Sequence, residues 1–153
     1  MAIEIEKEFE VEQSPEEVWA FLVDPHRVVE CLPGAELVGQ VDERTYEGKM
    51  GLELGPMGVT FGGTIHFDKL DEENLEVEMS GSGEDQKGTG GVKMSMNSRL
   101  ERLEEGGTRV AVRQDVRLSG KLASFGRGGL IQSVADMMFG RFTKCVTKKL
   151  AEG

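Results

Sequence analysis

Apolar and polar side chains alternate, with a period of two, in a series of short runs between residues 3 and 118. The first run carries glutamates at one parity and, at the other, Ile3, Ile5, Phe9 and Val11. Successive side chains of a β-strand point to opposite faces, so each run predicts a strand with one buried face. A sheet built from such strands must have its apolar face covered by another part of the chain.

The last stretch, residues 128–150, is the candidate cover. Its apolar side chains recur at helical spacing, at Leu130, Ile131, Val134, Ala135, Met138, Phe139, Phe142, Val146 and Leu150. This pattern predicts one long amphipathic helix, and glycines at 126, 128 and 129 break the chain before it. We therefore expect this helix and the sheet to enclose a hydrophobic cavity.

Two short helices are expected after the first strand. Ser14 is a helix N-cap, Pro15 suits the first helical position, and Glu17 completes a capping box. Asp24-Pro25 ends this helix and begins a second one, which stops at Pro33-Gly34.

The remaining runs predict strands near residues 37–41, 46–54, 59–67, 75–79, 92–100 and 110–118. Short turns such as Gly55 to Gly58 favour hairpins, and no βαβ rhythm is present. The expected fold class is therefore α+β, with a curved antiparallel sheet of six to seven strands in one domain, residues 1–153.

Two glycine-bearing segments predict local departures from regular strand structure. Gly62-Gly63 inside an alternating run predicts a bulge or a bend of a strongly curved sheet. The segment from Gly81 to Gly91 lacks the lysine–serine ending of a phosphate loop and runs between strands. It predicts a mobile hairpin beside the mouth of the cavity, because glycine gives the backbone freedom.

The outer faces of the first and last strands carry opposite charges. Glutamates occupy the first, and Arg109, Arg113 and Arg117 occupy the last. Opposite charges on paired strands attract, so we expect these strands to lie side by side, in the middle of the sheet. Damage from charge reversal at Arg113 should then be rescued by reversal at Glu8.

The net charge of −10 disfavours nucleic acid and anionic lipid as partners. The basic residues from Arg141 to Lys149 form either a solvated helix end or a weak docking patch. The acidic N-terminus does not resemble a signal peptide, and no apolar run of about 18 residues predicts a membrane span. Cys31 and Cys145 are far apart and lack metal-ligand spacing. With no secretory signal, we expect them to be free thiols in a reducing, cytoplasmic compartment.

Candidates for catalysis or metal binding are few. His66 shares the charged side of its run, and His26 follows a helix junction, so both are expected at the surface; a place for His26 at the cavity mouth is the alternative. No third ligand stands at metal-ligand spacing, so we expect no metal site. No nucleophile occupies a recognisable elbow, and Cys31 is expected to be a small buried residue.

The inward faces of the predicted strands and helix define a candidate ligand-binding lining. Its methionines are either ordinary core or a soft, adaptable surface for an apolar ligand. The expected lining consists of Tyr46, Met50, Leu52, Phe61, Ile65, Phe67, Val77, Met79, Met94, Met96, Leu130, Val134, Met138 and Phe142. Lys7 and Gln114 are polar exceptions on apolar faces, and they either lie at the sheet edge or orient the carbonyls of a ligand.

Several short segments occur in a characteristic order along almost the whole chain: Pro15–Trp19, Asp24-Pro25, Glu30–Ala35, Tyr46–Gly48, Leu54–Pro56, Phe61–Gly63, Gly81–Asp85, Gly88–Gly90 and Gly120–Gly126. Their order and spacing resemble the family of the carbon monoxide dehydrogenase G subunit, CoxG. That family lies within the START and birch-pollen-allergen (SRPBCC) superfamily. The resemblance implies a helix-grip fold, β-α-α-β6-α, whose sheet grips a long C-terminal helix.

The resemblance also implies a non-catalytic accessory protein. Such a protein would hold a quinone or lipid-like molecule, carry no covalent cofactor, and help recruit a molybdenum-containing dehydrogenase to the inner face of the cell membrane. Some members have a further C-terminal tail that engages the membrane; this chain stops at Gly153, so we do not expect autonomous anchoring. Two alternatives remain open: a cyclase- or hydrolase-like enzyme with a pocket acid or base such as Tyr46, and a scaffold with a filled core.

Overall fold

The computed structural model describes residues 2–126 and 129–153. Its first half contains β1 (Ala2–Val11), α1 (Pro15–Leu22), α2 (Pro25–Val29), β2 (Ala35–Asp42), β3 (Thr45–Leu54) and β4 (Met57–Asp71). The second half contains β5 (Glu76–Asp85), β6 (Gly91–Arg102), β7 (Thr108–Leu118), the 3-10 segment η1 (Gly120–Gly126) and α3 (Leu130–Glu152). The expected α+β class and element order are confirmed, while the expected chain break at Gly128 lies outside the described residues.

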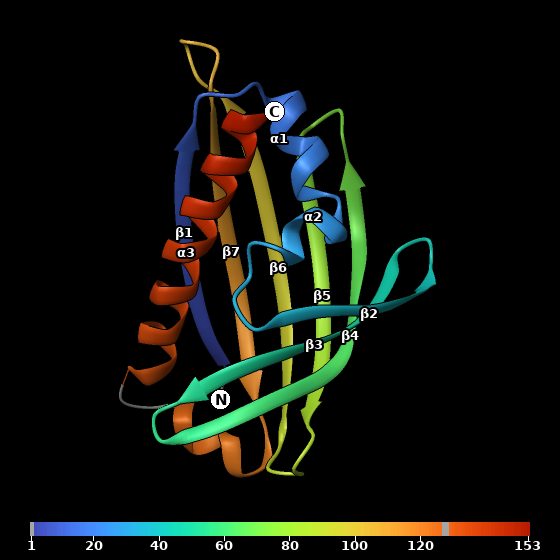
Figure 1. Cartoon of the computed structure of the whole chain (residues 1–153), viewed down its shortest axis with the longest axis vertical. Helices are drawn as coiled ribbons and strands as arrows, with labels where there is room; N and C mark the ends of the chain where they lie inside the picture. Colours follow the sequence, from blue (N-terminus) through green and yellow to red (C-terminus); the bar gives the residue numbers. More distant parts are fainter. Residues whose placement is uncertain (1, 127–128) are drawn as a thin grey trace.

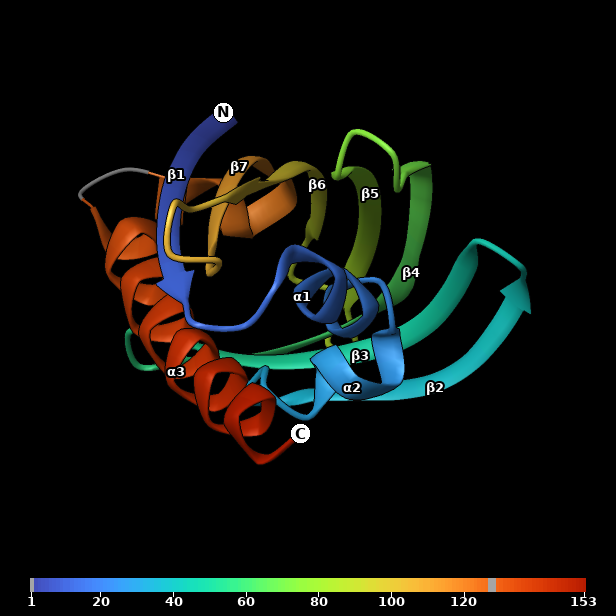
Figure 2. The ribbon, with the colours of Figure 1, turned by 90° about the horizontal axis from the view of Figure 1, so that it is seen from above.

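The strands form one seven-stranded antiparallel sheet with the order β1-β7-β6-β5-β4-β3-β2. The sheet is strongly curved, α3 lies across its concave side next to β1, and α1 and α2 cover the other part of that side (Figures 1 and 2). Both expected caps are present, because the Ser14 hydroxyl accepts from Glu17 N and the Asp24 carboxylate accepts from His26 N.

Two apolar clusters occupy the concave side. The first joins α1 and the end of α3 to the sheet and includes Phe9, Phe21, Phe67 and Val146. The second joins η1 and the beginning of α3 to the sheet and includes Leu122. The long helix therefore bridges both clusters, which confirms its expected role as the cover. Each fully buried side chain of this size contributes about 1.5–3 kcal/mol.

β1 and β7 are neighbours, as their opposite charges predict, but the predicted position in the middle of the sheet is wrong for β1. β1 pairs with β7, and Arg113 Nε lies 3.2 Å from Glu6 Oε1, while Arg113 Nη2 lies 3.5 Å from Glu4 Oε1. However, β1 is an edge of the sheet rather than its middle. Glu8 is also not the partner of Arg113, because the register places Glu8 opposite Ala111.

Gly62-Gly63 pairs regularly with both neighbouring strands, and the bulge of β4 lies instead between Phe67 and Lys69. The bend is present, since β4 curves sharply along its length (Figure 1). Gly63 is required for close approach, because a Cβ there would lie 1.9 Å from the carbonyl oxygen of Ser82. Of the two alternatives predicted here, the bulge is not at these glycines, and the curvature of β4 fits the bend.

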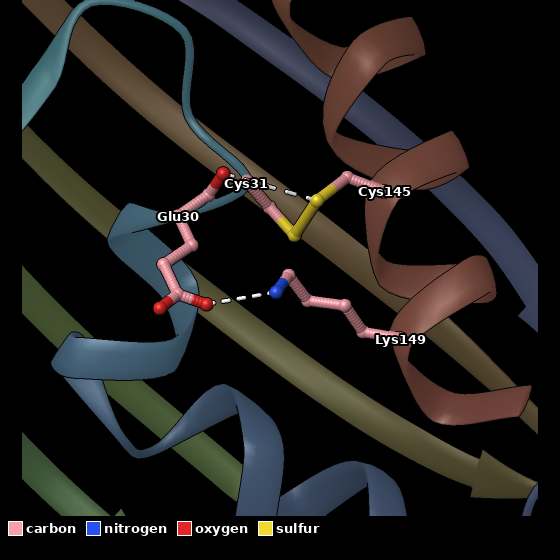
Figure 3. Close-up of a disulfide and its surroundings, with 4 residues drawn as sticks. All are labelled: Glu30, Cys31, Cys145 and Lys149. Atoms are coloured by element: carbon pink, nitrogen blue, oxygen red, sulfur yellow. Dashed lines mark hydrogen bonds and ion pairs between the residues drawn. A yellow bond between two sulfur atoms is a disulfide. The ribbon is translucent and has the colours of Figure 1, made fainter. Parts of the chain in front are cut away.

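The cysteines are not free. Cys31, which follows α2, and Cys145, on α3, form a disulfide with a Cα–Cα distance of 5.4 Å (Figure 3). The prediction of free thiols is wrong because residues separated by 114 positions are brought together only when α3 packs across the sheet. Neither cysteine is therefore the free thiol that was expected together with a reducing compartment. Cys31 is buried, as expected.

Candidate ligand-binding groove

A groove with a volume of about 640 Å³ lies between α3 and the β3–β4 hairpin. The loop between α2 and β2 and the turn between β5 and β6 complete its walls. Its lining residues are Pro33, Gly34, Gly51, Leu52, Glu53, Gly58, Val59, Thr60, Asp85, Gln86, Lys87, Met137, Met138 and Arg141.

The loop wall is fixed by a direct backbone contact. Gly34 has a φ of +83°, and a Cβ at this position would lie 2.3 Å from the carbonyl oxygen of Gly51. The amide of Gly51 donates a 2.8 Å hydrogen bond to the Gly34 carbonyl. Only glycine satisfies both the positive φ and the close approach, so Pro33-Gly34 is held against β3.

The turn wall is fixed by a buried carboxylate. Asp85, which is 5% exposed, accepts hydrogen bonds from the Thr89 hydroxyl and from the backbone amide of Thr60. These bonds, the one from Thr89 first, lower the pKa of the Asp85 carboxyl below its usual value. Residues 86–90 form the turn itself, which places Gln86 and Lys87 at the groove.

The glycine-rich segment is thus only partly what the sequence predicts. Gly81 to Asp85 belongs to β5, Gly91 begins β6, and residues 81–84 pair with both β4 and β6. Residues 81–91 therefore form the expected hairpin, but residues 81–85 belong to a regular strand, and the mobility of the hairpin stays a prediction. The expected position beside a ligand-sized opening is matched by the turn.

The groove combines apolar walls with a few charges. Leu52, Val59 and Met138 line it from strands and helix, and Met137 is 45% exposed. Arg141 and Lys87 also line it, and within residues 2–126 and 129–153 neither takes part in an ion pair. Such a mixture suits a molecule that is mostly apolar and carries a polar end.

The predicted lining residues divide into three groups. Leu52 and Met138 line the groove. Phe61, Phe67 and Val77 are buried core, while others pack against that core: Tyr46, Met79, Leu130, Val134 and Phe142. The third group lies on the inward parity of the strands outside both clusters and comprises Met50, Ile65, Met94 and Met96.

The third group leaves apolar surface on the concave side. Ile65 is 39% exposed although its neighbours of the same parity, Phe61 and Phe67, are buried. A Cβ at Gly81 would lie 3.6 Å from both Ile65 Cγ1 and Met94 Cε, so these side chains flank the same glycine. The sheet is therefore incompletely covered between its two core clusters.

Lys7 on β1 and Gln114 on β7 lie on paired strands, but they are not directly opposite each other, because the partner of Gln114 is Ile5. Lys7 forms an ion pair with Asp136 on α3, and the Gln114 amide donates to the sulfur of Met96 at 3.4 Å. Neither residue lines the groove.

Sequence reasoning missed the charged groove residues Lys87 and Arg141 and the loop residues Pro33-Gly34. Charged side chains on a helix or a turn are usually solvated, so the residue types of Lys87 and Arg141 alone do not indicate a binding site. The Pro33-Gly34 pair was available as a signal, but it predicted only the end of a helix.

Other candidate residues lie elsewhere. The His66 ring is 3.9 Å from Asp68 and bonds Thr45, and His26 pairs with Asp24; both side chains are exposed. The Tyr46 hydroxyl accepts from the Gln40 amide, and its ring packs edge-on against Phe67 and His26. Among the described residues, no group of three or more His, Cys, Asp or Glu side chains has the arrangement of a metal site.

Comparison with protein-family models identifies one family. Residues 8–151 match the model of CoxG, the G subunit of carbon monoxide dehydrogenase. The chain belongs to this family. A search of curated proteins finds no match to the sequence.

Solved structures show the same fold. A conserved protein from Geobacillus kaustophilus has a TM-score of 0.85 at 20% identity, covering 98% of this chain and 96% of that chain. The Zhui aromatase/cyclase from Streptomyces sp. R1128 has a TM-score of 0.71 at 13% identity, covering 99% and 94%. A START superfamily protein from Mycobacterium smegmatis has a TM-score of 0.64 at 13% identity, covering 97% of each chain. The chain therefore has a START-like fold, as the resemblance implied.

None of the helices in the described parts of the chain combines the length and the apolar character needed to cross a bilayer.

Proposed function

We propose that this CoxG family protein binds a hydrophobic small molecule, quinone- or lipid-like, in the groove between α3 and the β3–β4 hairpin. The observation that carries the proposal is the groove itself. Its volume of about 640 Å³ falls within the range of about 300–1,000 Å³ that is usual for small-molecule sites. Family membership and the START-like fold support the same assignment.

The groove offers a matching surface for such a ligand. Leu52, Val59 and Met138 provide apolar contact, and burial contributes about 0.8 kcal/mol per methylene group. About ten buried ligand carbons would therefore stabilise the complex by several kcal/mol. Arg141 and Lys87 are placed to receive the polar end of the ligand, for example the carbonyl oxygens of a quinone.

The proposed role is that of an accessory protein rather than a catalyst. The family name is that of a subunit of carbon monoxide dehydrogenase, which supports docking to a molybdenum-containing dehydrogenase. In this proposal the protein carries its apolar ligand at the inner face of the cell membrane, in peripheral contact with it. Affinity capture of the protein from its own host tests the partner: recovery of a molybdenum-containing dehydrogenase supports docking, and its absence contradicts it.

The binding proposal is tested with decylubiquinone as the probe, by isothermal titration and by thermal unfolding. We expect saturable binding and an increase in melting temperature, both lost in Met138→Arg because a charge then occupies an apolar wall. Val38→Arg is the matched control, because Val38 is 54% exposed on β2 and does not line the groove. A folded wild-type protein that shows no binding, or equal loss in both variants, contradicts the proposal.

A further inference from the structure

The disulfide joins two walls of the groove. Cys31 lies just before Pro33-Gly34, which form the loop wall, and Cys145 lies one turn after Arg141, which belongs to the helix wall. Figure 3 shows the bond spanning the space between the end of α2 and α3. The groove walls on either side of this bond are therefore connected covalently.

The end of α3 near Cys145 is one of the two places where this helix is attached to the rest of the fold. The side chains of α3 that are buried are Val146 and Leu150, both close to Cys145, while the groove residues Met137 and Met138 are exposed or half-buried. The first half of α3 is attached separately, since the partly buried Leu130 and Val134 pack against the second cluster. The groove residues of α3 lie between these two attachments, and the disulfide fixes the end nearer to Arg141.

An ion pair beside the disulfide also links α3 to the end of α2, and its contribution is small. Lys149 Nζ lies 2.8 Å from Glu30 Oε2, beside the disulfide (Figure 3). Lys149 lowers the pKa of the Glu30 carboxyl, first through this hydrogen bond and then through its charge. Both side chains are substantially exposed, and ion pairs of this kind contribute little and are screened by salt. The ion pair cannot replace the covalent bond.

We propose that the Cys31–Cys145 disulfide is a site of thiol–disulfide exchange that controls how firmly the groove holds its ligand. This inference rests on the proposed function and adds its regulation. The oxidised protein keeps the loop wall and the helix wall at a fixed separation, which pre-organises the groove. Reduction frees the two walls from each other, so the ligand dissociates faster.

The co-reactant is a dithiol. Its thiolate attacks Cys145 Sγ, because Cys145 is half-buried whereas Cys31 is 3% exposed. A mixed disulfide forms, and Cys31 leaves as a thiolate and takes up a proton. The second thiol of the dithiol then displaces Cys145 as a thiolate, which also takes up a proton. The protein gains two electrons and two protons, and the dithiol becomes a cyclic disulfide.

The reduced state has a local hydrogen bond available. Cys145 Sγ lies 3.9 Å from the carbonyl oxygen of Glu30. A disulfide sulfur has no proton to donate, but a reduced Cys145 thiol has one. The freed thiol can therefore be accommodated beside α2 without an unpartnered polar group.

The test uses the full chain in three forms: oxidised, reduced with dithiothreitol, and the Cys31→Ser/Cys145→Ser double variant. Hydrogen–deuterium exchange is measured for residues 30–36 and 137–146, and stopped-flow fluorescence measures dissociation of decylubiquinone. We expect faster exchange in both segments and about tenfold faster dissociation on reduction, as lost pre-organisation predicts. The double variant should match the reduced form and should not respond to dithiothreitol.

The outcomes separate this inference from the proposed function. Equal exchange in the oxidised and reduced proteins, or purified protein that carries two free thiols without reductant, overturns the inference. Equal dissociation rates in both states also overturn it and leave ligand binding intact. If decylubiquinone binds in neither state, the proposed function fails for this probe, and control of the groove's hold on a ligand fails with it.

Discussion

Asp85 is the residue that ties the β5–β6 turn to the rest of the groove. Its carboxylate receives the Thr89 hydroxyl from the turn and the Thr60 amide from β4. The glycine-rich sequence on both sides predicts a flexible backbone, and this buried carboxylate holds the turn against β4 by hydrogen bonds. The Asp85 carboxylate therefore connects β4 to the turn that presents Lys87 to the groove.

We expect Asp85→Asn to weaken the acid sensitivity of the fold. The pKa of Asp85 in the folded protein is lowered by its hydrogen bonds, first by that from Thr89. The carboxylate therefore stabilises the fold above the unfolded value of about 3.9, and this contribution is lost as the pH falls through the lower, folded pKa. Thermal unfolding between pH 7 and pH 2 measures the effect: the variant should melt earlier at pH 7 and lose less below about pH 4.

The matched control for this prediction is Asp115→Asn, because Asp115 is exposed on β7. The control should follow the wild-type pH profile. Parallel pH profiles for wild type and Asp85→Asn would show that the carboxylate does not act as argued.

At the scale of elements, the pairing of β1 with β7 combines backbone register with charge. Arg113 contacts Glu4 and Glu6, and Arg109 Nη2 lies 3.0 Å from Glu10 Oε2. Because β1 is an edge strand, these ion pairs help to define the one neighbour that β1 has. Their individual contributions are small, since all the side chains are exposed.

A double-mutant cycle tests this pairing. Arg113→Glu should lower the free energy of unfolding by about 1 kcal/mol, because it places a like charge beside Glu4 and Glu6. Adding Glu6→Arg should recover part of that loss, whereas adding Glu8→Arg should not, because Glu8 lies opposite Ala111. Urea denaturation measures each step, and equal recovery by the two second substitutions would contradict the register.

The sequence predicts most elements of this fold because local patterns determine them. The alternating pattern predicts a strand from Tyr46 to Leu54, which agrees closely with β3, and Gly55-Pro56 predicts the turn to β4. The extension of β5 over Gly81 to Asp85 was not predicted, because its strand character comes from pairing with neighbouring strands and not from side-chain pattern. Charge complementarity identified β7 as the neighbour of β1, but it contains no information on which of the two has a second neighbour.

The groove was less predictable than the fold. Leu52 and Met138 were found because they lie on inward faces, which periodicity reveals. Pro33, Lys87 and Arg141 line the groove only because a loop, a turn and a helix meet there, and these meeting points are set by tertiary packing. The same reason explains the missed disulfide, whose cysteines lie on two of these elements.

At the scale of the whole molecule, α3 connects the two apolar clusters and the disulfide closes the chain between α2 and α3. The first cluster contains Val146 and Leu150, and partly buried Leu130 and Val134 pack against the second. Closing a long loop restricts the unfolded chain more than a short one. The disulfide therefore stabilises the whole fold, in addition to holding the groove walls together.

We expect the Cys31→Ser/Cys145→Ser double variant to lose about 4 kcal/mol of unfolding free energy, because the bond closes a loop spanning 114 positions. Urea denaturation without reductant measures the difference, and reduced wild type should unfold at nearly the same urea concentration as the variant. Lys149→Ala, which removes only the neighbouring ion pair with Glu30, should cost at most about 1 kcal/mol. A double variant as stable as the oxidised wild type would mean that packing of α3 alone, without the covalent bond, holds it on the sheet.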